Sequence, residues 1–312
     1  MYQPVYRLLI QTSFVFFVLT FVPALLSIPV RAAASGENQD ISQEIWRIDT
    51  RTAGTKHSEE KSLQHMRFFR WQNGYWKPSD AAAFLETQNP KLPLIVFVPG
   101  WRSPTDQTTE TGFHLVRKLG AEKACRIVFW DWLSEPVFIR PRIDIQHKIP
   151  VAAGNGEMLN TFVRKMPPGS KVCLFGFSFG CRIIGHACES LTQDNMPKDM
   201  RLHLVLAAAA IDQYGLAAGH RQENIPQIAE KTFISYNSQD RALRWYCAVY
   251  RGHTRVQALG RTGPPWQMIA PEFRERIEAV NLFPYIGREH RTTVHIDSPA
   301  FKNRISRYFF FE

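Results

Sequence analysis

From about residue 90 onward, the chain alternates short, continuous apolar runs with segments of helical periodicity. The apolar runs span residues 94–98, 127–132, 172–175, 202–208, 232–236 and 277–283. The helical stretches between them span 113–119, 156–165, 182–191, 225–231 and 242–250. Continuous apolar runs of this length are typical of strands that are buried on both faces. The alternation therefore predicts an α/β fold, a mostly parallel sheet with helices on both faces.

The segment before residue 90 has a different pattern. A strand-like island at 45–48 precedes two aromatic stretches within 68–76, which flank the turn sequence Gln72-Asn73-Gly74. An Asn-Gly pair between alternating apolar residues is a strong indication of a β-hairpin. We expect these segments to form an antiparallel N-terminal edge of the sheet.

Residues 1–34 have the layout of an export signal. Arg7 precedes a nearly uncharged apolar stretch from Leu8 to Val30, and Ala32, Ala33 and Ala34 provide an A-x-A cleavage site. The stretch also approaches the length that spans a bilayer, so an uncleaved membrane anchor and a buried N-terminal helix are the alternatives. We expect a signal peptide or anchor over 1–34, one domain over 35–312, and an exported protein of the periplasm or cell envelope.

Composition and charge narrow the function classes. The chain is 45% hydrophobic with a formal net charge of +10, and the two arginines within 1–34 leave +8 on the remainder. The basic residues are scattered and no nucleic-acid motif accompanies them, so no nucleic-acid partner is expected. A solvated basic surface is the simplest interpretation, and contact with an anionic membrane surface is the alternative. The five cysteines show no C-x-x-C pair or zinc spacing, which favours buried small side chains.

The third run ends in Gly176-Phe177-Ser178-Phe179-Gly180 and passes directly into an apolar helical start. A G-x-S-x-G sequence between a strand and a helix is typical of a nucleophile elbow, in which a strained turn exposes the Ser hydroxyl. Ser178 is therefore the candidate nucleophile, and a simple helix cap is the alternative. The loop after 94–98 begins Pro99-Gly100-Trp101. We expect the backbone N–H groups of Trp101 and Phe179 to form an oxyanion hole.

A catalytic acid and base should follow the nucleophile. Asp240 comes after the run 232–236, and Asp212, after the run ending at Ala210, is the alternative acid. Both could instead cap helices. Two histidines, His290 and His295, lie beyond the last predicted strand and before a terminal helix that should begin at Ser298-Pro299. We expect His290 to be the base because it lies nearer the strand end, beside Gly287, and we keep His295 as the alternative. The order Ser, Asp, His is that of α/β hydrolases.

Over roughly residues 90–312 the chain resembles the α/β-hydrolase superfamily. It is similar to bacterial α/β hydrolases of unknown function whose strands end in V-H-G, W-P-S, H-S-M-G, L-A-A-P-D and Y-x-S-x-x-D-x-A-L. The corresponding positions here are 98–100 (V-P-G), 132–134 (W-L-S), 177–180 (F-S-F-G), 206–209 (L-A-A-A) and 236–243 (Y-N-S-Q-D-R-A-L). The last match favours Asp240 over Asp212. Pro99, Phe177 and Phe179 replace the usual His, His and Met, which alters the pocket wall.

The resemblance implies acyl transfer by a Ser178-His-Asp240 triad without a metal or organic cofactor. Four aromatic residues are placed to line the pocket, which favours a small, apolar ester as substrate; core packing is the alternative role for Trp101, Trp130, Phe177 and Phe179. The sequence thus predicts an esterase-like serine hydrolase. The alternative function is a membrane-tethered, non-catalytic binding or scaffold protein that retains the hydrolase fold.

Overall fold

The computed structural model describes residues 43–52, 63–120, 123–250 and 256–311. The segment 1–34, expected to be a signal peptide or anchor, lies outside the described residues. None of the helices within the described ranges is long and apolar enough to cross a membrane.

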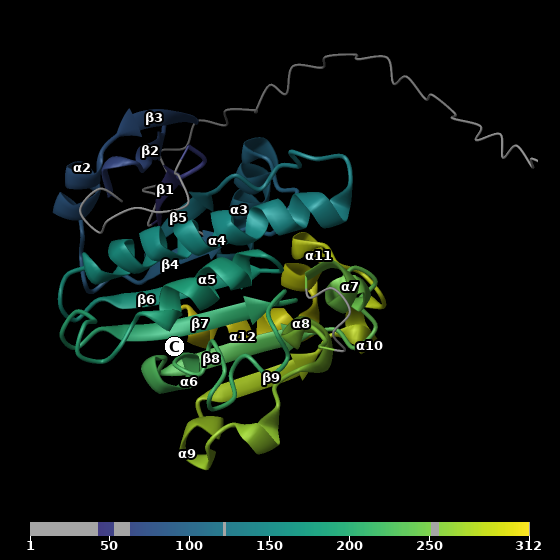
Figure 1. The fold of residues 1–312 in the computed structure, drawn as a ribbon. Helices are drawn as coiled ribbons and strands as arrows, with labels where there is room; N and C mark the ends of the chain where they lie inside the picture. The colour runs from purple at the N-terminus through teal and green to yellow at the C-terminus, as the bar shows by residue number, and fades with distance from the viewer. Residues whose placement is uncertain (1–42, 53–62, 121–122, 251–255, 312) are drawn as a thin grey trace, which may run out of the picture. The chain divides into compact units, whose positions relative to one another are not determined.

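One nine-stranded sheet forms the centre of the described body (Figure 1). Its strand order is β3-β2-β1-β5-β4-β6-β7-β8-β9. The strands are β1 (Gln43–Asp49), β2 (Arg67–Gln72), β3 (Tyr75–Ser79), β4 (Leu94–Val98), β5 (Cys125–Asp131), β6 (Lys171–Phe177), β7 (Arg201–Ala207), β8 (Lys231–Tyr236) and β9 (Ile277–Asn281). From β1 to β9 in this order, each strand is parallel to its neighbour. β2 is antiparallel to both of its neighbours, β1 and β3. The predicted fold class is confirmed.

The antiparallel edge is the β2–β3 hairpin. Asn73 and Gly74 form its turn with positive φ angles of 54° and 85°, a conformation that Asn and Gly adopt at little cost. Trp71 and Trp76 face each other across the hairpin in register, with ring centroids 5.1 Å apart. β1 differs from the prediction, since it is antiparallel to β2 but parallel to β5. It therefore joins the hairpin to the parallel sheet.

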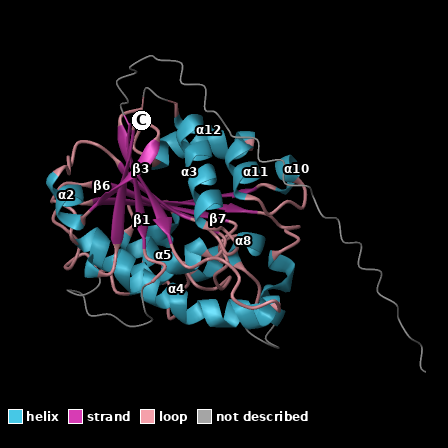
Figure 2. Cartoon of the chain, turned by 90° about the horizontal axis from the view of Figure 1, so that it is seen from above, coloured by secondary structure: helices cyan, strands magenta, loops and turns pink. Residues whose placement is uncertain are grey.

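Helices cover both faces of this sheet (Figure 2). The apolar core accordingly divides into two main clusters: α4 and α5 pack over Val96 and Val128, whereas α3 and α12 pack over Phe97 and Phe129. The longer helices are α3 (Thr105–Leu119), α4 (Pro141–Arg164), α5 (Gly180–Glu189) and α12 (Pro299–Tyr308). The shorter elements are α2 (Ala81–Glu86), α6 (Ile225–Ile228), η1 (Leu243–Trp245), α7 (Tyr246–Tyr250), α8 (Leu259–Thr262), η2 (Trp266–Met268), α9 (Pro271–Arg274), α10 (Phe283–Ile286) and α11 (Thr292–Asp297).

Element boundaries differ from the prediction where tertiary context overrides local sequence. α4 begins 15 residues before the expected 156 and continues through Pro150, a residue that usually interrupts helices. The helix expected to reach Lys231 ends at Ile228, because Lys231 pairs with His203 of β7. The last strand ends at Asn281 rather than 283, and α10 follows it. The terminal helix starts as predicted: the Ser298 hydroxyl accepts the Phe301 N–H at 3.3 Å.

The cysteines fulfil the packing role expected of them. All five have free thiols, and four are buried, Cys247 being the partly exposed one. Burial raises the pKa of Cys125 and of Cys188 to about 12, so these thiols stay protonated at neutral pH.

Candidate active site

Ser178 occupies a strained turn between β6 and α5. Its φ angle is 51°, in the left-handed region that non-glycine residues rarely adopt. The neighbouring strand β7 holds the turn in place: the Ser178 N–H donates to Ala207 O at 2.8 Å, and Ser178 O accepts the Ala210 N–H at 3.0 Å. Strain of this kind persists only where surrounding bonds impose it, and it is a common feature of catalytic residues.

Two glycines allow the strand and helix to pass each other at this turn. A Cβ atom at Gly176 would lie 2.9 Å from the Cα of Cys181, and one at Gly180 would lie 2.1 Å from the carbonyl oxygen of Val98. Neither position has room for a side chain, because backbone atoms are the obstacles. The G-x-S-x-G sequence therefore forms the predicted strand–turn–helix elbow.

The structure brings together the three residues predicted as a catalytic triad. His290 Nε2 lies 2.9 Å from Ser178 Oγ, and His290 Nδ1 lies 2.6 Å from Asp240 Oδ2. Ser178 is 8% exposed and Asp240 is fully buried. With the Nδ1 proton donated to the carboxylate, Nε2 is left as the acceptor for the Ser178 hydroxyl. This arrangement is one in which a histidine can take the proton of a serine nucleophile.

Asp240 makes the contacts expected of both roles that the sequence offered as alternatives, a triad acid and a helix cap. Its Oδ1 atom accepts the N–H groups of Ala242 and Leu243, both at 2.8 Å, and so caps the helical turn after β8. Its Oδ2 atom faces His290. One carboxylate has acceptor capacity for both, so the cap fixes the orientation of the oxygen that meets the imidazole.

Asn237, which the sequence interpretation did not single out, positions the loop of His290. Its side-chain amide donates to Gly287 O at 2.8 Å and to Glu289 O at 3.2 Å, on both sides of Arg288. Asn237 is fully buried and follows directly on β8. A polar residue immediately after a buried strand was the available signal, because the carboxyl ends of the strands carry the site.

The alternative acid and base lie in other surroundings. Asp212 forms an isolated bridge with Ala258, and its carboxylate accepts the Tyr214 N–H at 3.2 Å. His295 lies within α11, not in the connecting loop where it was expected. It is fully buried, and its ring packs nearly perpendicular to that of Phe177, with 5.3 Å between centroids. Burial, reinforced by the nearby His290, lowers the pKa of His295 to about 3, so its ring is neutral.

The loop after β4 approaches the elbow closely. A Cβ atom at Gly100 would lie 3.2 Å from Ser178 Cβ, so the backbone before Trp101 lies against the nucleophile. Trp132 fixes this loop, since its indole donates to Pro99 O at 2.9 Å and its ring stacks on Phe179 at 5.5 Å. Trp101 and Phe179, the predicted oxyanion residues, are thus on the two segments that adjoin Ser178.

Ser178 and His290 line two cavities. The larger measures about 410 Å³ and is mostly apolar; its lining consists of Trp101, Arg102, Pro141, Ile145, Ser178, Ala242, Leu243, Trp245, Val249 and His290. The smaller measures about 160 Å³, is more polar, and includes Gln107, Thr111, Thr292 and Thr293. The Ser178 hydroxyl therefore lies between an apolar and a polar compartment.

Two of the aromatic residues predicted to line the pocket belong instead to the core. Trp130 is fully buried and its indole donates to Asn155 Oδ1 at 3.2 Å, while Phe179 packs beneath Trp132. Trp101 lines both cavities and Phe177 lines the polar one. Alternate residues of a strand point to opposite faces, and with helices over both faces the sequence pattern does not distinguish core from pocket.

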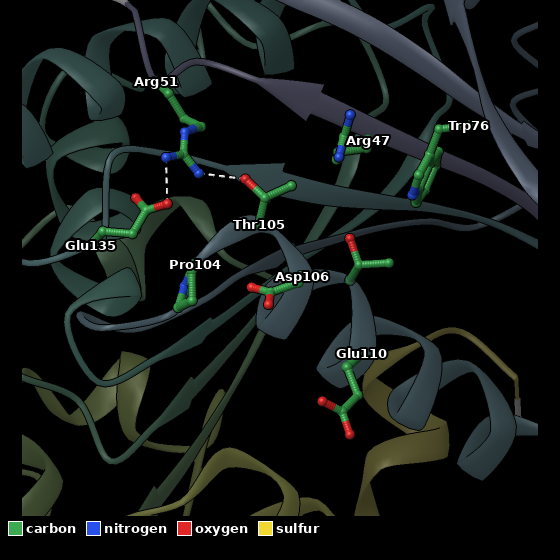
Figure 3. A pocket seen from close by; sticks show the side chains of 9 residues that line it. Arg47, Arg51, Trp76, Pro104, Thr105, Asp106, Glu110 and Glu135 are labelled. Atoms are coloured by element: carbon green, nitrogen blue, oxygen red, sulfur yellow. Dashed lines mark hydrogen bonds and ion pairs between the residues drawn. The ribbon is translucent and has the colours of Figure 1, made fainter. Parts of the chain in front are cut away.

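A larger cavity, about 760 Å³ and widely open, does not include Ser178 or His290 (Figure 3). Arg51 lies at its wall and contacts both Thr105 and Glu135. Its volume does not make it the active site, because it lacks a nucleophile paired with a base. In the part of the chain that the structure describes, no group of three His, Cys, Asp or Glu side chains could hold a metal ion.

No protein-family model and no curated protein sequence matches the chain. Among solved structures, the chain is similar to the lin2722 gene product of Listeria innocua, with 8% identity and a TM-score of 0.39 over 70% of this chain and 93% of that one. A bifunctional GH43-CE protein of Bacteroides eggerthii has 11% identity and a TM-score of 0.38, over 88% of this chain and 38% of that one. An acetyl xylan esterase has 11% identity and a TM-score of 0.34, over 70% and 95%.

Proposed function

We propose that this protein is a serine hydrolase that cleaves carboxylic esters through an acyl-enzyme. The observation that carries the proposal is the hydrogen-bonded series from Ser178 through His290 to Asp240, mounted on a strained elbow at the carboxyl edge of the sheet. A serine hydroxyl is a weak nucleophile unless a base accepts its proton and a third group orients that base. The contacts of His290 and Asp240, which come from distant parts of the chain, support both conditions.

In the first half of the reaction, Ser178 Oγ attacks the ester carbonyl carbon while its proton moves to His290 Nε2. The Nδ1–H of His290 donates to Asp240, whose negative charge stabilises the imidazolium. The N–H groups of Trp101 and Phe179 are the proposed donors to the oxyanion, and α5, which begins at Gly180, adds its N-terminal dipole. Collapse of the tetrahedral intermediate breaks the bond to the alkoxide, which takes the proton from His290.

In the second half, water attacks the acyl carbonyl. His290 removes the proton of that water, and Ser178 takes it back as the acid leaves. The 410 Å³ cavity with Ile145, Leu243 and Val249 in its wall suits an apolar acyl or aryl group, and the polar cavity suits the other side of the ester. Substrates with a medium apolar chain are therefore expected to be preferred.

The test is labelling with a fluorophosphonate probe, which reacts with a serine only when a base activates it. The wild type should be labelled, and a folded Ser178→Ala variant should not. Turnover of p-nitrophenyl esters of increasing acyl length then measures the preference of the apolar cavity. A folded wild type that resists the probe would overturn the enzyme proposal and favour the non-catalytic scaffold.

A further inference from the structure

An apolar loop projects into solvent between β5 and α4. Three of its side chains and Ile143, at the start of α4, are far more exposed than large hydrophobic residues usually are, and we call these four the apolar tip: Val137 (53%), Phe138 (41%), Ile139 (97%) and Ile143 (43%). An isolated exposed hydrophobic residue is common, but four within seven residues form a patch that indicates a binding surface.

The apolar tip adjoins the mouth of the active-site cavity. Pro141 and Ile145, which alternate with Ile143 along the start of α4, line that cavity together with Ser178. Trp245 lines its other side and is itself 56% exposed. α4 also packs against α7, the helix that follows Trp245. An apolar surface that the tip contacts is therefore brought next to the entrance of the site.

Basic residues accompany these apolar ones. Arg140 and Arg142 lie between Ile139 and Ile143 of the tip, and both are exposed without an ion pair among the described residues. The guanidinium of Arg244 lies over the ring of Trp245, 4.9 Å from its centroid. The two carboxylates near the tip are engaged elsewhere: Glu135 pairs with Arg51, and Asp144 is fully buried. The rim thus presents positive charge beside apolar side chains, which is complementary to an anionic lipid surface.

Asp144 holds the backbone of the tip by hydrogen bonds. Its Oδ1 atom accepts the N–H groups of Val137 at 2.6 Å and Phe138 at 2.9 Å, and its Oδ2 atom accepts the indole N–H of Trp101. Burial alone would raise the pKa of Asp144, but these three donors and the charge of Lys148 outweigh it and lower the pKa. The carboxylate therefore remains ionised at neutral pH and connects the tip to the wall of the active site.

We propose that the apolar tip and Trp245 dock the protein onto an anionic membrane surface. Ile139, Phe138 and Trp245 enter the boundary between head groups and acyl chains, and Arg140 and Arg142 contact lipid phosphates. The docking itself does not depend on catalysis. Its consequence, that an amphiphilic ester passes from the lipid layer directly to Ser178, rests on the proposed hydrolase function.

The test places an environment-sensitive fluorophore on the tip of the full-length chain. Ile139→Cys is labelled in a Ser178→Ala, Cys247→Ser background, so that neither turnover nor the partly exposed native thiol interferes. The matched control is Met268→Cys, since Met268 is 45% exposed and lies in η2, before the start of β9. Met268 lines neither cavity that contains Ser178, and from η2 the chain continues through α9 to the start of β9, which is parallel to β8 and so begins at the sheet edge opposite the active site.

With vesicles of phosphatidylcholine and phosphatidylglycerol, the fluorophore at 139 should shift to the blue and the one at 268 should not. Replacing Arg140 and Arg142 with Gln should weaken this response about tenfold, and high salt should do the same. This comparison holds even if residues 1–34 also bind lipid, because it reports the depth of one residue. No shift at 139, an equal shift at 268, or an equal response to pure phosphatidylcholine would overturn the proposal. Since the background is inactive, none of these outcomes bears on the hydrolase function, which probe labelling tests separately.

Discussion

His290 Nδ1 meets Oδ2 of Asp240 at 2.6 Å, although 50 residues separate the two along the chain. The other oxygen of the same carboxylate is tied to two backbone N–H groups at the start of η1. Local secondary structure therefore fixes the carboxylate that faces the imidazole. Mutation can separate its capping of the helical turn from its proposed role in catalysis.

Asp240→Asn should remove catalysis while leaving the fold largely intact. The Asn side-chain oxygen can still cap Ala242 and Leu243, but its amide donates to Nδ1 and so favours the wrong imidazole tautomer. We expect kcat for a p-nitrophenyl ester to fall by about 10³- to 10⁴-fold. Asp240→Ala should lose similar activity and, in addition, about 1 kcal/mol of stability with the cap. Urea unfolding of both variants provides the comparison, and an Asn variant that retains wild-type kcat would contradict the assignment.

The site was predictable because its residues terminate continuous apolar runs. Ser178 follows β6 and Asp240 follows β8, and the carboxyl ends of parallel strands meet at one edge whatever their separation in sequence. Side-chain direction was not predictable in the same way. The sequence around Trp130 in β5 does not indicate that its indole contacts Asn155 in α4 and does not line the cavity.

The element boundaries that the sequence did not predict are also explained by tertiary packing. The start of α4 was hidden because Pro150 argues against a helix on local grounds, yet packing against α5 and the sheet outweighs that preference. His295 was placed in a loop because it lies between the last predicted strand and the helix that begins at Ser298-Pro299, whereas the segment folds as α11 with His295 buried.

Gly180→Ala should damage the elbow. Its new methyl group would lie 2.1 Å from the Val98 carbonyl oxygen, and relief requires α5 to move away from β4. We expect a loss of about 3 kcal/mol in the free energy of unfolding and a large fall in kcat. Gly185→Ala, in the same helix, is the matched control, because its methyl group meets the flexible side chain of Gln222 at 3.1 Å. That variant should keep its activity; equal damage in both would mean that helix packing in general, and not the elbow, is being measured.

Substitution of His290 should affect ester turnover, whereas substitution of His295 should affect the pH dependence of stability. His290→Ala should lower ester turnover by about 10²- to 10⁴-fold with little change in stability, since this residue is the proposed base. His295→Leu should retain turnover and remove a pH dependence. The folded-state pKa of His295, about 3, lies below its ordinary 6.5, so the unfolded state binds its proton more readily. Wild-type stability should therefore fall as pH drops from about 6.5 toward 3, and the Leu variant should lose less over that window.

Thermal unfolding of the two variants and the wild type at several pH values makes this comparison, together with p-nitrophenyl ester assays at pH 7.5. Activity lost in His295→Leu but kept in His290→Ala would reverse the assignment of the base.

Asp131→Asn should stabilise the protein at neutral pH. Asp131 is buried at the end of β5, and burial raises its pKa to about 6, because the neighbouring Thr105 hydroxyl and Arg51 charge offset the loss of water only in part. Between pH 4 and 6 the folded state therefore holds a proton that the unfolded state has released, so this residue makes the protein less stable as pH rises through that window. The Asn variant has no such charge to bury.

Urea titrations measure the difference in the free energy of unfolding between Asp131→Asn and the wild type. This difference should be absent near pH 4 and should reach on the order of 2 kcal/mol in favour of the variant above pH 6. Glu110→Gln, a neutral substitution at an exposed residue that lines the 760 Å³ cavity together with Arg51, should keep the wild-type profile. An Asn variant less stable than wild type at pH 7.5 would show instead that attraction to Arg51 outweighs the cost of burial.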